Sequence, residues 1–149
     1  MKTYRTLSSE KTRDLGGEFA KKLISKGKRN SAFVVGLRGE LGSGKTTFTQ
    51  GFLRELGVVR APSPTFVLVK KYQIEAGGFS SVFHLDLYRL DKAEDILALD
   101  WEEIIKNPSN IVIVEWIERV GKLLPRNSIL VNFSHGNGGQ ERVIEWNGE

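Results

Sequence analysis

The sequence contains no cysteine and only one methionine among its 149 residues. The missing cysteine excludes a disulfide framework, a thiolate-based zinc site and a thiol nucleophile. No apolar run approaches the ~18 residues that a membrane span needs, and the N-terminal segment lacks the apolar core of a signal peptide. We therefore expect a soluble, cytoplasmic protein without a membrane partner.

The sequence also lacks a strong excess of one charge, because it has 22 Lys+Arg and 18 Asp+Glu, a net charge of only +4. This weak basic balance is compatible with an anionic partner but does not identify one. The basic clusters Lys21-Lys22, Lys26-Lys28-Arg29 and Lys70-Lys71 leave a nucleic-acid-binding module open as a hypothesis. Lysine pairs without interleaved aromatic residues are more typical of solvated faces.

The length predicts a single domain over residues 1–149, at roughly 150 residues per domain. The pattern predicts an α/β fold with a mixed, mostly parallel central sheet, flanking helices and antiparallel hairpin additions. The expected strands are an edge strand at 3–7, buried strands at 32–37 and 111–114, and hairpins at 66–73/81–88 and 129–133/142–146. Three helices are expected. The first is capped by Ser8 or Ser9 and carries an apolar stripe of Leu15, Phe19 and Leu23. The second spans 45–56, and the third spans 93–106, where the residues able to face a core are Ile96, Leu97, Ile104 and Ile105.

Glycine is the residue type in surplus, with 16 copies, and several of them fall between residues 36 and 44. The segment Gly39–Thr46, read GELGSGKT, fits the pattern G-x-x-x-x-G-K-[ST]. Glycines let successive N–H groups point at phosphate oxygens, and the N-terminus of the following helix favours the same anion. Lys45 would reach the β- and γ-phosphates, and the Thr46 hydroxyl would ligate Mg²⁺. The segment thus predicts a P-loop NTPase-like fold, and the missing guanine-reading N-K-x-D favours ATP.

An acidic residue is needed to complete the magnesium shell of such a site, and two candidates stand out. Glu115 follows the buried run 111–114, at the carboxyl end of a central strand. Its alternative interpretation is a carboxylate that stabilises a helix N-terminus. Asp86 shares a strand face with His84, and its alternative is a turn or cap carboxylate.

Three further residues each allow two interpretations. His84 is either a general base or, as is more common on a polar strand face, a structural histidine. Trp116, expected to be exposed beyond its strand, either stacks on a base or partner or simply packs. Thr65, in the rigid segment 62–66, either contacts the γ-phosphate as a switch residue or belongs to a structural turn.

Taken together, four blocks in this order resemble the TsaE (YjeE) family of small P-loop ATPases. They are GELGSGKTT at 39–47, SPTF at 63–66, HLDLYRL at 84–90 and VEWIERV at 114–120. The resemblance covers nearly the whole chain. It implies Mg²⁺-dependent ATP hydrolysis that is slow alone and stimulated by partner proteins. It further implies a role in threonylcarbamoylation of adenosine 37 in tRNAs reading ANN codons, through a TsaB–TsaD heterodimer-type assembly, with tRNA contacted only indirectly or weakly.

Carried onto this chain, the resemblance and the motif together give a set of expected site residues. The residues expected to bind ATP are Leu41, Gly42, Ser43, Gly44, Lys45, Thr46, Thr47 and Ser9. Those expected to take part in catalysis are Lys45, Asp86, Glu115 and Thr65, and those expected to bind Mg²⁺ are Thr46, Glu115 and Asp86. The alternative function is a P-loop kinase for a small molecule or nucleoside, although 149 residues leave little room for its lid.

Overall fold

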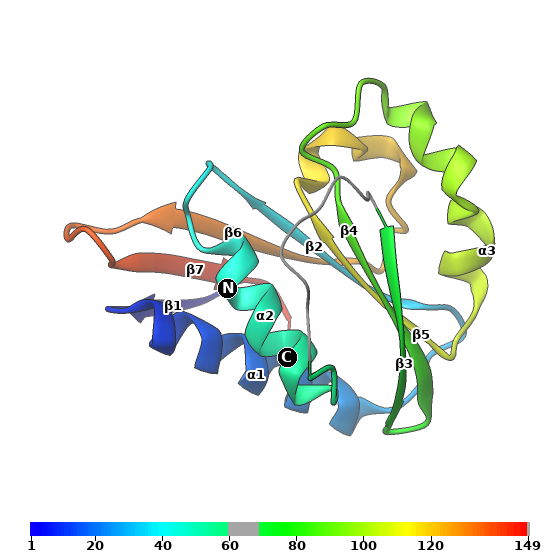
Figure 1. Ribbon diagram of the computed structural model, residues 1–149, viewed down its shortest axis with the longest axis horizontal. Helices are drawn as coiled ribbons and strands as arrows, with labels where there is room; N and C mark the ends of the chain where they lie inside the picture. Colours follow the sequence, from blue (N-terminus) through cyan, green and yellow to red (C-terminus); the bar gives the residue numbers. More distant parts are fainter. Residues whose placement is uncertain (60–68, 149) are drawn as a thin grey trace.

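The computed structural model describes residues 1–59 and 69–148, which form a seven-stranded sheet in the order β1-β7-β6-β2-β5-β4-β3 (Figure 1). The strands are β1 (Lys2–Thr6), β2 (Phe33–Gly39), β3 (Val69–Ala76), β4 (Phe79–Asp86), β5 (Asn110–Glu115), β6 (Ile129–His135) and β7 (Arg142–Trp146). The four central strands, β4, β5, β2 and β6, run parallel, whereas β3, β7 and β1 join antiparallel. This arrangement confirms the predicted mixed sheet with hairpin additions.

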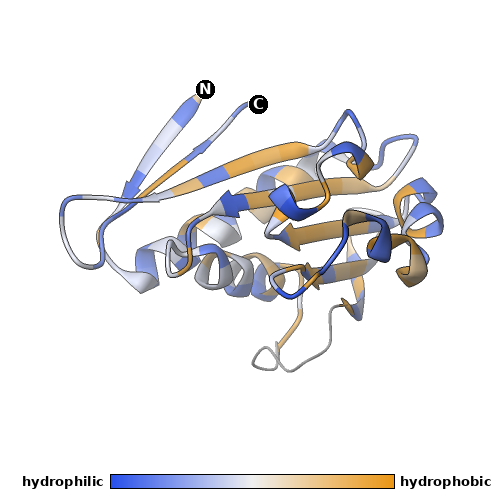
Figure 2. Cartoon of the chain, turned by 90° about the horizontal axis from the view of Figure 1, so that it is seen from above, coloured by the Kyte–Doolittle hydropathy of each residue, from blue (hydrophilic) through white to orange (hydrophobic). Residues whose placement is uncertain are grey.

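Helices cover both faces of the sheet, in two separate groups (Figure 1). The first group is α1 (Ser9–Lys26) and α2 (Lys45–Glu55), and the second is η1 (Ala93–Leu99), α3 (Trp101–Lys106), η2 (Ile117–Arg119) and η3 (Gly121–Leu123), where η denotes a 3₁₀ helix. Strands β2 and β5 are buried on both faces, as their unbroken apolar sequences predict. Figure 2 shows this as apolar central strands with polar residues at the periphery. In the described part of the chain, no helix has the length and apolarity needed to span a bilayer.

Helix α1 begins and packs as its sequence predicts. The Ser8 hydroxyl accepts a hydrogen bond from the Lys11 N–H at 3.2 Å, which satisfies one of the free donors of the first turn. Leu15, Phe19 and Leu23 are buried against the sheet and α2. The Ser8 cap therefore resolves the choice between Ser8 and Ser9, and Ser9 becomes the first helical residue.

The prediction of a single helix over 93–106 is wrong, because this region forms two separate helices. The chain forms the 3₁₀ helix η1, turns through Asp100 at φ +59°, and starts the separate helix α3. A left-handed residue cannot continue a right-handed helix, so the two pieces present different faces. Ile96 and Ile104 are buried as expected, but Leu97 is 45% exposed.

Candidate functional site

The phosphate-loop motif lies where β2 ends and α2 begins. Gly42 and Gly44 have φ angles of +75° and +105°, a left-handed conformation that other residues adopt only with strain. Gly44 is the N-cap of α2 and offers no side chain to cap it, and the first turn of α2 carries no acidic residue. The N–H groups of this helix start therefore remain available to an anion, and the helix dipole favours one.

Lys45 is the first residue of α2 and is 4% exposed. Its ammonium donates hydrogen bonds to the carbonyl oxygens of Gly39 and Glu40, at 2.5 and 2.9 Å, and lies 3.9 Å from the centroid of the Trp116 ring. Burial lowers the pKa of Lys45, and the carboxylates of Glu118, Glu115 and Asp86 oppose that shift. The loop thus holds the Lys45 ammonium group against its own backbone carbonyls, beside the start of α2.

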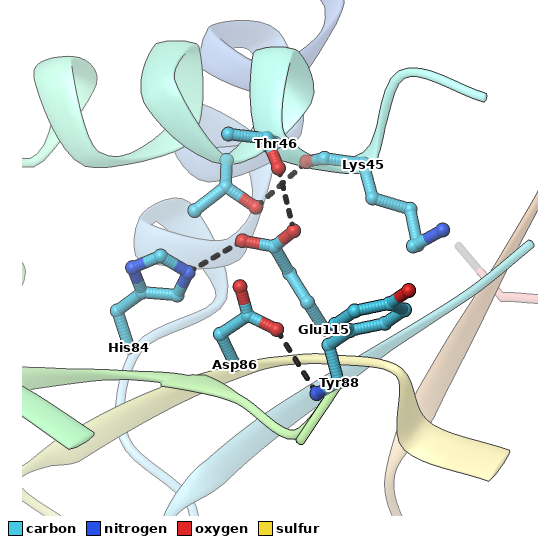
Figure 3. A network of polar contacts seen from close by, with 7 residues as sticks. Lys45, Thr46, His84, Asp86, Tyr88 and Glu115 are labelled. Atoms are coloured by element: carbon cyan, nitrogen blue, oxygen red, sulfur yellow. Dashed lines mark hydrogen bonds and ion pairs between the residues drawn. The ribbon is translucent and has the colours of Figure 1, made fainter. Parts of the chain in front are cut away.

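Glu115 is the buried centre of a polar network (Figure 3). Its side chain is 2% exposed; one carboxylate oxygen accepts from the Thr46 hydroxyl at 2.8 Å, and the other lies 2.6 Å from Nε2 of His84. Strand alternation explains this meeting, because the side chains of β4 and β5 that face α2 include His84 and Glu115. The network joins the first turn of α2 to the carboxyl ends of two neighbouring strands.

Asp86 ends β4 directly beside Glu115 in the strand register. Its Oδ1 accepts a hydrogen bond from the Tyr88 N–H at 3.1 Å, so the turn interpretation of this carboxylate describes a real contact. Burial raises the pKa of Asp86, and the negative charge of Glu115 raises it further, against the Tyr88 N–H, His84 and Lys45. Two carboxylates on adjacent strands therefore share one partly buried space, where a cation would relieve their repulsion.

Trp116 follows Glu115 and is half-buried, so the expectation of an exposed ring is wrong. Its backbone adopts φ +62°, a left-handed conformation rare for a large residue, and this bend starts η2. The ring lies 5.0 Å from that of Tyr88, centroid to centroid, and under the Lys45 ammonium. The bend therefore folds the indole back over the phosphate loop, where it packs against residues of the site.

The remaining residues expected to bind ATP differ in their exposure to solvent. Ser43 is buried in the loop, Thr47 is half-buried, and Leu41 is 70% exposed at the loop tip. Ser9 is exposed at the start of α1. Thr65 lies outside the described residues.

Two neighbours of the loop were not singled out by the motif. A Cβ built on Gly44 would lie 3.4 Å from the Thr12 methyl group and 3.6 Å from Cγ of Arg142. These residues come from α1 and β7, at opposite ends of the chain, and only the packing of α1 and the β6–β7 hairpin around the loop brings them together. Motif spacing carries no signal for such neighbours.

The oxygen donors of the network fit a magnesium site with few protein ligands better than a metal site built entirely from protein side chains. Within residues 1–59 and 69–148, no group of three or more His, Asp or Glu side chains is arranged to hold a metal ion. Mg²⁺ instead typically takes one or two protein oxygens and fills its octahedron with water and substrate phosphates. The Thr46 hydroxyl and the Glu115 carboxylate, 2.8 Å apart beside the phosphate loop, are oxygen donors of this kind.

Comparison with known proteins agrees with this arrangement. The family model "Threonylcarbamoyl adenosine biosynthesis protein TsaE" matches residues 6–144. The chain is 38% identical over 121 residues to the tRNA threonylcarbamoyladenosine biosynthesis protein TsaE of Haemophilus influenzae, covering 80% of this chain and 73% of that one. It is 33% identical over 145 residues to the Bacillus subtilis protein of the same name, covering 95% and 82%.

A solved structure shows the same fold. The crystal structure of Bacillus subtilis YdiB superposes with a TM-score of 0.72 and 28% sequence identity, covering 97% of this chain and 83% of that one. The family match spans more than nine-tenths of the sequence and runs from β1 into β7. The chain therefore belongs to the TsaE family of threonylcarbamoyladenosine biosynthesis proteins.

Proposed function

We propose that this protein is a Mg²⁺-dependent ATPase with a P-loop NTPase-like fold, which supports threonylcarbamoylation of tRNA by acting on a TsaB–TsaD assembly. The observation that carries the proposal is the hydrogen bond between Thr46 and Glu115, at 2.8 Å. It joins the hydroxyl of the G-x-x-x-x-G-K-[ST] motif to the acidic residue that ends the neighbouring parallel strand, beside the buried Lys45.

Each group has a defined task in this proposal. The N–H groups at the start of α2 and the Lys45 ammonium bind the phosphates and offset their charge. Thr46 and Glu115 would hold Mg²⁺, which would neutralise phosphate charge when bound. Asp86, whose raised pKa reflects burial and the nearby Glu115, would orient water or share the metal site.

The location of the site suggests how the activity serves a partner. The exposed Leu41 at the loop tip and the exposed Tyr88 flank the same site, and both are large apolar side chains open to solvent. Exposed apolar side chains are typical of protein interaction sites, so a partner bound here would contact the protein beside its nucleotide site. We infer cytoplasmic action on the protein assembly, with tRNA contacted only indirectly.

The first experiment measures ATP binding and phosphate release with and without Mg²⁺, in the wild type, Lys45→Ala and Lys106→Ala. Hydrogen bonds to charged groups contribute about 1.5–3 kcal/mol, so Lys45→Ala should weaken ATP binding by about 10–100-fold. Lys106 lies exposed on α3, across the sheet, and its substitution should leave binding unchanged. Equal ATP affinity in both variants would refute the assignment of Lys45.

The second experiment adds TsaB and TsaD and compares phosphate release with their binding to this protein. Stimulated hydrolysis supports the proposed partner, and no association in the presence or absence of ATP would refute it. Phosphate transferred to a metabolite or nucleoside in place of water would support the alternative, a P-loop kinase.

A further inference from the structure

The Glu115 carboxylate has two hydrogen-bond partners, and only one of them belongs to the phosphate-loop motif. Thr46 donates to Oε1, and Nε2 of His84 lies 2.6 Å from Oε2, a short hydrogen-bond distance. A carboxylate oxygen accepts in such a contact, which is made by the His84 tautomer that carries its hydrogen on Nε2. The imidazole therefore fixes the side of Glu115 that faces away from Thr46 (Figure 3).

The contact gives His84 a place in the site that differs from a general base. Its side chain is 18% exposed and its Nε2 is directed at a carboxylate that is 2% exposed. While Nε2 donates to Glu115 it presents no lone pair, so this nitrogen cannot remove a proton at the phosphate loop. The arrangement resembles the outer partner of a metal ligand, which orients that ligand through a hydrogen bond.

Strand geometry shows why Glu115 needs such a partner. Asp86 is paired with Glu115 in the register of β4 and β5, and it is a like charge. A buried carboxylate with one unpaired oxygen carries a desolvation penalty, and it is free to rotate away from Thr46. His84 lies two residues before Asp86 on the same face of β4, so its ring satisfies the second oxygen from the side opposite Thr46.

We propose that His84 is a positioning residue that holds the Glu115 carboxylate in the orientation that presents Oε1 to Thr46 and to the bound cation. The inference rests on the proposed function, in which this pair of oxygens binds Mg²⁺. Loss of an outer partner of a metal ligand typically weakens metal affinity by about 10–100-fold, without loss of the ligand itself. In this role His84 acts through its hydrogen bond to Glu115.

The test measures Mn²⁺ binding by electron paramagnetic resonance, in the presence of ATP, for the wild type, His84→Ala, His84→Leu and His84→Gln. The leucine variant keeps apolar bulk at the position, so it separates loss of the hydrogen bond from loss of packing. Glutamine restores an N–H donor of similar reach. His135→Ala is the matched control, since the chain's other histidine is exposed at the end of β6.

We expect about 10–100-fold weaker Mn²⁺ binding in His84→Ala and His84→Leu, and recovery to within about 3-fold of the wild type in His84→Gln. ATP affinity measured in EDTA should stay within about 2-fold in all variants, because the phosphate loop is unchanged. Wild-type Mn²⁺ affinity in the leucine variant, or a glutamine variant as weak as the leucine variant, would overturn the role of His84 alone. A wild-type protein that binds no Mn²⁺–ATP would instead overturn the proposed function and this inference with it.

Discussion

Substitution of Gly51 by alanine provides the sharpest test of how α1 and α2 pack. A Cβ at Gly51 would lie 2.7 Å from the carbonyl carbon of Arg13 on α1, and closer still to its oxygen. Carbon atoms in contact prefer about 3.5–4.0 Å, so the two helices would have to separate by about 1 Å. A gap of that size forfeits up to half of the dispersion energy of each contact that it opens. The contacts at risk include those of the Phe19 ring with Phe48 and Phe52.

The expected magnitude combines two opposing effects. Overpacking typically costs about 3 kcal/mol at its upper range, while alanine gains about 1 kcal/mol over glycine in a helix. The net prediction is a loss of about 2 kcal/mol in the free energy of unfolding for Gly51→Ala. Gly17→Ala is the matched control, because its Cβ would meet the Gly51 oxygen at an ordinary 3.6 Å. This variant should gain about 1 kcal/mol from helix propensity.

Thermal unfolding followed by circular dichroism checks both variants. At about 2–4 °C per kcal/mol for a chain of this size, the Tm of Gly17→Ala should exceed that of Gly51→Ala by about 6–12 °C. Equal Tm values, or a Gly51→Ala variant more stable than the wild type, would refute the close packing of α1 on α2.

Two further predictions concern Asp86 and the start of α1. Because burial and Glu115 raise the pKa of Asp86 in the folded protein, the charged carboxylate is disfavoured there. The wild type should therefore lose stability relative to Asp86→Asn as pH rises from the unfolded pKa of about 3.9 through the higher folded value. Urea unfolding at pH 4 and pH 7 measures this difference, and a gap that stays constant or changes in the opposite direction contradicts it. At the helix start, Ser8→Ala should cost about 1 kcal/mol by removing the cap bond to Lys11. Ser9→Ala should change the free energy of unfolding by less than about 0.5 kcal/mol, and equal effects of the two serine substitutions would contradict the cap assignment.

Much of the fold and part of the site could be predicted from local sequence patterns. The buried strands β2 and β5 are continuous apolar runs, and such runs are stable only when both sheet faces are covered. A serine cap at position 8 or 9 and the stripe Leu15–Phe19–Leu23 each depend on neighbouring residues of one helix, and the structure chose Ser8 as the cap. The region 93–106 was not predictable in this way, because the left-handed turn at Asp100 has no glycine to mark it.

By itself, the sequence determined the phosphate loop, because its chemistry depends on consecutive residues: glycines that turn the backbone, then a lysine and a hydroxyl at the helix start. It also placed Glu115 at the end of a buried strand and Asp86 within the strand expected over 81–88, but left open which of them meets Thr46. Only the tertiary structure decided that, through the order β2-β5-β4, which places Glu115 one strand from the loop and Asp86 two strands away. The same order brings His84 onto Glu115, a contact between residues 31 positions apart. Contacts of this kind depend on how strands pair across the sheet, and that pairing is set by the packing of the whole chain rather than by neighbours in sequence.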